Sequence, residues 1–123
     1  MLSEGVSEQV IGAAIKVHRA LGPGLLEKPY KMCLAHELRR RGLSVAQEQV
    51  LDLHYDELVV PGVYRLDLIV DDAIVVEVKS VETLKPVHEA QLLTYLQLTG
   101  LRVGLLLNFN VPRLKDGLVR RVR

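Results

Sequence analysis

The fold of this chain is decided by residues 62–79, GVYRLDLIVDDAIVVEVK. Neighbouring side chains on a strand point to opposite faces. The stretch therefore predicts two strands, residues 62–70 and 73–79, separated by the turn signal Asp71-Asp72. One face of this strand pair is wholly apolar and suited to packing against a helix, with Leu66, Leu68, Val70, Ile74, Val76 and Val78. The opposite face carries Arg65, Asp67, Glu77 and Lys79.

The length of the connection decides whether Asp67 and Glu77 meet. They face each other directly if the connection has three residues, 71–73, or contains a bulge, whereas a two-residue turn separates them. Directly opposed residues on antiparallel strands have Cβ atoms about 5 Å apart, a spacing that lets two carboxylates share one divalent cation. Without a cation, two such close anions raise each other's pKa. The alternative is a solvated strand face of mixed charges, which is the commoner origin of an isolated Glu-x-Lys.

A helix is predicted over residues 86–99, because Pro86 suits a first helical turn and Gly100 suits a C-terminal cap. Its expected buried stripe is Leu92, Leu93 and Leu96. Gln91 and Tyr95 are four residues apart on another face, so their side chains could act together. A glutamine amide and a tyrosine hydroxyl can both donate to a phosphate. An ordinary polar helix face is the alternative interpretation.

The remaining elements predict one α/β domain over residues 1–123. Helices are expected at residues 3–21 and 28–41 around a 22–24 loop, followed by a strand near residues 45–55. Residues 102–109 indicate a buried strand and residues 118–122 a short edge strand. The fold class is thus α/β, a mixed central sheet flanked by helices.

Composition sets limits on function. Sixteen Lys and Arg against fifteen Asp and Glu give a formal net charge of +1, so bulk charge does not indicate nucleic-acid binding. The arginines at residues 39–41 and 120–123 are interpreted first as helix-end charge and solvation. No apolar run is long enough to span a membrane and residues 1–7 lack a signal-peptide pattern, so a cytoplasmic protein is expected.

Histidine and cysteine do not indicate a zinc site, because four scattered histidines and one cysteine lack zinc-ligand spacing. Cys33 is interpreted as a small core residue. His18 has two interpretations, a buried histidine bonded to a neighbour or a role near the metal site, and the first is favoured.

The ordered set Asp67, Glu77-x-Lys79 and Gln91-x-x-x-Tyr95 resembles the PD-(D/E)XK nuclease superfamily. The segment GLLEKPY, residues 24–30, is similar to the pattern that names the GxxExxY protein family, a branch of that superfamily. The resemblance runs from His18 to residues 108–112. Leu66 stands where the superfamily's name has proline, a position without a direct chemical role.

The resemblance implies a restriction-endonuclease-like core and a set of residue roles. Asp67 and Glu77 would ligate Mg²⁺ or Mn²⁺ with the backbone carbonyl of Val78, and Glu27 would be an additional ligand, direct or through water. Lys79 would orient or help deprotonate the attacking water. Gln91 and Tyr95 would position Lys79 and the scissile phosphate. Tyr30 is interpreted as a packing residue.

The expected function is therefore a metal-dependent nuclease that hydrolyses phosphodiester bonds, with DNA as the favoured nucleic-acid partner and RNA left open. The alternative is a non-cleaving module that binds nucleic acid or protein and retains the nuclease fold. A homodimer or a partner protein is compatible with either. Near-neutral charge favours the alternative, whereas the acidic pair with Lys79 favours the enzyme.

Overall fold

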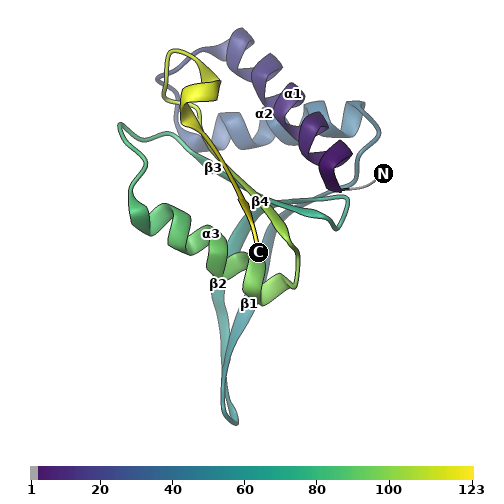
Figure 1. The fold of residues 1–123 in the computed structure, drawn as a ribbon, viewed down its shortest axis with the longest axis vertical. Helices are drawn as coiled ribbons and strands as arrows, with labels where there is room; N and C mark the ends of the chain where they lie inside the picture. Colours follow the sequence, from purple (N-terminus) through teal and green to yellow (C-terminus); the bar gives the residue numbers. More distant parts are fainter. Residues whose placement is uncertain (1–2) are drawn as a thin grey trace.

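The structure, a computed structural model, describes residues 3–123 (Figure 1). Its elements follow in chain order: α1 (Ser3–Leu21), α2 (Glu27–Arg40), β1 (Val45–Tyr55), β2 (Leu58–Val70), β3 (Ile74–Lys79), α3 (Pro86–Thr99), β4 (Val103–Asn108), the short 3-10 helix η1 (Leu114–Gly117) and β5 (Leu118–Val122). None of the helices in this part of the chain is long and apolar enough to cross a membrane.

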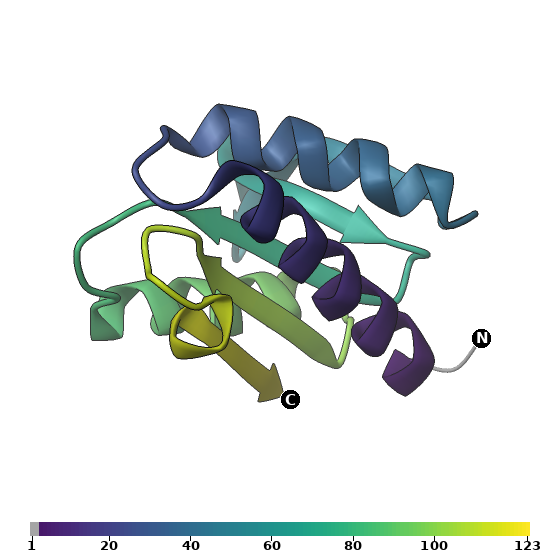
Figure 2. The same ribbon diagram turned by 90° about the horizontal axis from the view of Figure 1, so that it is seen from above.

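The strands form a five-stranded mixed sheet in the order β1-β2-β3-β4-β5. β3 and β4 are parallel, with α3 in the connection between them, and the other neighbours pair antiparallel. Figure 2 shows α1 and α2 on one side of this sheet and α3 on the other. The structure thus confirms the predicted α/β class, a mixed sheet flanked by helices.

β3 and β4 lie at the centre of the sheet and are covered on both faces. On β3, Ile74, Val76 and Val78 pack into the larger apolar cluster with α1 and α2. Val75 packs into a smaller cluster under α3. Two-sided burial explains why both strands are nearly continuous apolar runs, as expected for a parallel pair. Glu77 is the charged exception on β3 within this buried region.

β2 does not keep one face along its length, and here the prediction was wrong for Leu66. Leu68 and Val70 pack with α1 and α2, but Leu66 packs under α3. The change of face occurs at Asp67. By the β1–β2 register, Asp67 stands opposite Glu48, whose backbone has a left-handed φ of 53°. This local irregularity breaks the strict alternation from which the uniform apolar face was predicted.

Other element predictions needed smaller corrections. β2 begins at Leu58, because it pairs with β1 as far as Tyr55. On α3, Leu93 is exposed and Tyr95 is buried, so Tyr95 replaces Leu93 in the predicted stripe. Cys33 is exposed and is not a core residue. Gly100 caps α3 in a left-handed conformation with φ 75°, as predicted from glycine at this position.

Candidate active site

Asp67 and Glu77 lie opposite each other at the point where the β2–β3 ladder ends. The register Val70↔Ile74 leaves a three-residue connection, residues 71–73, and the ladder continues to Leu68↔Val76. Beyond that pair, backbone N–H groups of the two strands donate to the carboxylates of Asp67 and Glu77 and not to backbone carbonyls of the facing strand. The Asp67 N–H donates to Glu77 Oε2 at 2.8 Å, and the Val78 N–H donates to Asp67 Oδ2 at 2.8 Å. The two carboxylates are therefore held in place by each other's strand.

Burial makes this pair electrostatically unfavourable without a cation. Glu77 is only 5% exposed, and burial, followed by the charge of Asp67, raises the pKa of Glu77 to about 8. Burial also raises the pKa of Asp67, although the Val78 N–H and the charge of Lys31 act in the opposite direction. The fold thus positions two hard oxygen ligands where extra positive charge would stabilise both.

Lys31 is a site residue that the sequence reasoning missed. Its Nζ lies 3.1 Å from Glu48 Oε1 and 3.4 Å from Asp67 Oδ1. Burial alone would lower the pKa of Lys31, but the hydrogen bond to Glu48 and the charge of Asp67 leave it raised. Lys31 follows Glu27 by four residues and so lies on the same side of α2. This four-residue spacing was the signal in the sequence that could have indicated Lys31. The contact between Lys31 and Glu48 could not be predicted in this way, because it depends on how β1 pairs in the sheet.

Lys79 and Tyr95 approach the acidic pair from two elements. Lys79 is half-buried at the end of β3, and its charge lowers the pKa of both carboxylates. The ring of Tyr95 makes an edge contact with Tyr64, at 6.0 Å between centroids. Burial and the charge of Glu77 raise the pKa of the Tyr95 hydroxyl, which keeps it protonated as a donor.

Gln91 and Glu27 lie at the margin of this arrangement. Gln91 is exposed on α3, one turn before Tyr95, and Glu27 is half-buried at the first residue of α2. Across residues 3–123 no three His, Cys, Asp or Glu side chains gather as a ready metal-binding group. Asp67 and Glu77 are thus brought together directly, and Glu27 does not join them as a third close carboxylate.

Tyr30 and His18 build the scaffold behind the site. The Tyr30 ring is fully buried and stacks on Phe109 at 4.5 Å. Its hydroxyl accepts from the Leu25 N–H and donates to the Gly22 carbonyl, which fixes the loop before α2. His18 is buried, with Nε2 2.8 Å from the Val111 carbonyl oxygen. Tyr30 is a packing residue as predicted, and the geometry of His18 agrees with the favoured interpretation.

Comparison with known proteins identifies the family. A model of the PD-(D/E)XK nuclease superfamily matches residues 4–122. Neither the curated proteins nor the solved structures compared with the chain gave a match. The family match covers nearly all of the chain, and the mixed sheet with its flanking helices agrees with it. The chain belongs to the PD-(D/E)XK nuclease superfamily.

Proposed function

We propose that the chain is a divalent-metal-dependent nuclease of the GxxExxY branch, which hydrolyses phosphodiester bonds in DNA. The observation that carries this proposal is the convergence of Asp67 and Glu77, with Lys79 close enough to lower the pKa of both carboxylates. A purely structural strand pair gains nothing from burying two adjacent carboxylates, because desolvation and mutual repulsion both oppose it.

The residues present fit Mg²⁺ or Mn²⁺. Carboxylate oxygens suit both ions, and Mg²⁺ is commonly held by only one or two carboxylates with waters and substrate phosphates completing its shell. The absence of a third gathered carboxylate among residues 3–123 is therefore compatible with this ion. Asp67 and Glu77 would hold it with the Val78 carbonyl, and Glu27 would contribute through water. When bound, the ion lowers the pKa of its water and offsets charge on the phosphate.

The protein's own donors complete the chemistry. Lys79, on the same face of β3 as Glu77, would orient the attacking water and stabilise the charge that develops on the phosphate. The protonated Tyr95 hydroxyl would donate to a phosphate oxygen, and its oxygen could accept a hydrogen bond from the Lys79 ammonium. Gln91, one exposed turn earlier, is available to contact the substrate backbone. Donors carried by β3 and α3 are preorganised, because both elements pack into one buried cluster.

The test is cleavage of labelled single-stranded DNA, duplex DNA, branched DNA and RNA in Mg²⁺ or Mn²⁺ at low salt. Wild type is compared with Lys79→Ala and with Arg102→Ala, an exposed control that immediately precedes β4. The start of β4 pairs with Ile74 and its end pairs with Lys79. Arg102 therefore lies at the opposite end of the strand pair from Lys79. We expect wild type and Arg102→Ala to cleave DNA, and Lys79→Ala to lose about 10²–10³-fold in rate.

A non-cleaving binding module is the second candidate, and Lys31 is the observation that favours it. Its ammonium already offsets part of the Asp67 charge without a metal. If folded wild type binds Mn²⁺ and nucleic acid but cleaves none of the four substrates, the nuclease proposal fails and the module is supported. Cleavage of RNA alone would overturn only the choice of DNA.

A further inference from the structure

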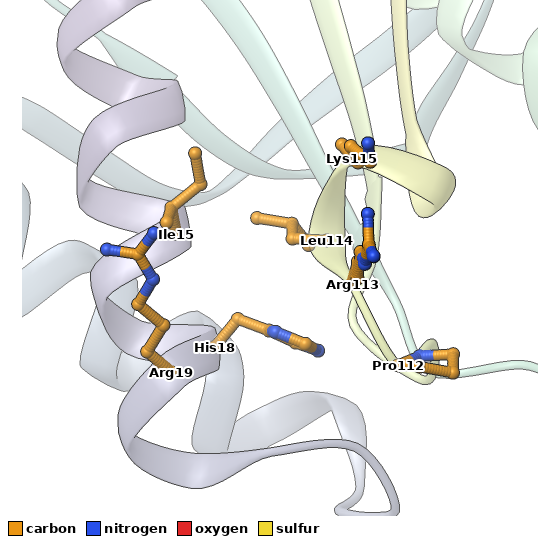
Figure 3. A pocket seen from close by; sticks show the side chains of 7 residues that line it. All are labelled: Ile15, His18, Arg19, Pro112, Arg113, Leu114 and Lys115. Carbon is orange, nitrogen blue, oxygen red and sulfur yellow. The ribbon is translucent and has the colours of Figure 1, made fainter.

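A cleft lies between the last turns of α1 and residues 112–115, which lead into η1 and form its start (Figure 3). Its volume is about 320 Å³. Ile15, Pro112 and Leu114 give it an apolar lining, and the buried His18 forms part of one wall. Arg19 comes from α1, and Arg113 and Lys115 come from the opposite side. We call the cleft, with these three cations, the basic cleft.

The three cations of the basic cleft are not used elsewhere. Among residues 3–123, none of them is in an ion pair, and no carboxylate is among the residues that line the cleft. Arg40 and Arg41 pair with Glu37, and Arg121 pairs with Glu89. Several other arginines of the described residues are also without an ion pair, so what distinguishes the cleft is that three such cations line one cavity. In a chain of net charge +1, this is a local excess of positive charge.

The wall that carries Arg113 and Lys115 is anchored to the strand ends beside Lys79. The Phe109 N–H donates to the Lys79 carbonyl at 2.9 Å. Further along, η1 approaches β4 so closely that a Cβ on Gly117 would lie 2.2 Å from the Asn108 carbonyl oxygen. Because β3 and β4 run parallel and Lys79 pairs with Asn108, the basic cleft and Lys79 share one end of the sheet.

We propose that the basic cleft binds a backbone phosphate of DNA outside the segment being cleaved. This inference rests on the proposed function and adds a second contact to it. Arginine guanidinium groups match phosphate oxygens in a bidentate geometry, and lysine adds a point charge. The apolar lining is compatible with the sugar next to that phosphate. Phosphate contacts at Lys79 and at the basic cleft, both at one end of the sheet, would attract the DNA backbone locally, which a net charge of +1 does not do.

The experiment measures duplex DNA binding by fluorescence anisotropy over a range of KCl, in a Lys79→Ala background that slows cleavage about 10²–10³-fold. The cleft variant is Arg19→Gln, Arg113→Gln, Lys115→Gln. The control variant is Arg102→Gln, Arg120→Gln, Arg123→Gln, which removes the same charge from exposed positions that do not line the cleft. Thermal unfolding verifies that both variants fold, and single Lys115→Glu provides a milder change if the triple variant does not.

We expect the cleft variant to weaken binding at least about tenfold and to lower the slope of log affinity against log salt by about 0.9 for each lost phosphate contact. The control should keep the parental slope. Equal losses in both variants, an unchanged slope in the cleft variant, or no DNA binding by the parent would overturn the inference. In the cleaving protein, the cleft changes should raise KM and leave kcat unchanged. Absence of cleavage with intact cleft-dependent binding would refute only the nuclease activity.

Discussion

On β3, the apolar residues of one face and Glu77 on the other face are buried to a similar degree but contribute opposite energies. Ile74, Val76 and Val78 are fully buried against α1 and α2, and apolar burial of this kind stabilises the fold. On the other face Glu77 is nearly as buried, next to Asp67, and burying a charge beside a like charge opposes folding. One strand therefore anchors the core and holds a destabilised site, which is the pattern expected where local rules are broken for function.

The largest stability effect should come from the core face. Ile74→Ala removes fully buried methylene and methyl groups and should lower the free energy of unfolding by about 2–5 kcal/mol. Urea denaturation should show a lower midpoint with an unchanged slope. Val59→Ala on the exposed part of β2 is the control and should change stability by less than about 0.5 kcal/mol. Equal losses in the two variants would contradict the assignment of the core.

The site face should respond in the opposite direction. Glu77→Gln keeps the shape but removes the buried charge, so the metal-free variant should be more stable than wild type at pH 8, by on the order of 1–2 kcal/mol. Exposed Glu57→Gln at the turn before β2 should be neutral. A Glu77→Gln protein that is less stable than wild type at pH 8 would show that its charge stabilises the fold.

The pH dependence follows from the raised pKa. Folded Glu77 titrates near pH 8 instead of its ordinary 4.5, so between these values the folded state binds more protons than the unfolded state. The free energy of unfolding of metal-free wild type should then fall as pH rises from 5 to 8, and the raised pKa of Asp67 acts in the same direction. Glu77→Gln should flatten most of this slope, as measured by urea denaturation at each pH. A wild-type slope that rises with pH would refute the assignment.

A substitution of Lys31 measures how much of the negative charge of Asp67 is already offset without a metal ion. Lys31→Met keeps the side-chain length but removes the charge beside Asp67, so the repulsion of an incoming cation disappears. Calorimetric titration should show Mn²⁺ binding about fivefold more tightly, equivalent to about 1 kcal/mol. Lys28→Met, exposed on the same helix, should leave the affinity unchanged. Weaker Mn²⁺ binding in Lys31→Met would mean that Lys31 supports the metal-bound geometry.

The smallest effect is expected at Glu27. Since Glu27 does not gather with Asp67 and Glu77 as a third close ligand, Glu27→Gln should change Mn²⁺ affinity by less than about threefold, or about 0.6 kcal/mol. Asp67→Asn in the same titration should lose most of the binding. A large loss in Glu27→Gln would show that this carboxylate ligates the ion directly.

The sequence predicted the fold class and the acidic pair because these depend on local patterns. Alternation along residues 62–79, a three-residue connection and the Pro86 and Gly100 signals define the strand pair and α3, and the observed register at Val70↔Ile74 agrees. The roles proposed for Lys79, Gln91 and Tyr95 stay predictions until activity is measured.

What the sequence did not predict depends on contacts between distant segments. Leu66 changes face because of an irregularity at Glu48, opposite Asp67, and nothing in the strand pattern indicates that irregularity. Lys31 meets Glu48 and Asp67 only after α2 packs near the sheet. The basic cleft combines Arg19 with residues more than ninety positions away along the chain. Such juxtapositions become visible only in the folded structure.

Thermal unfolding at pH 8, with and without Mn²⁺, measures whether the buried pair Asp67 and Glu77 binds a divalent cation. Saturating Mn²⁺ should raise the midpoint of wild type by several degrees, because the ion binds only the folded state. Glu77→Gln should start from a higher midpoint without metal and show little further rise. No response of wild type to Mn²⁺, or an equal response in both proteins, would show that the carboxylate pair does not bind the ion.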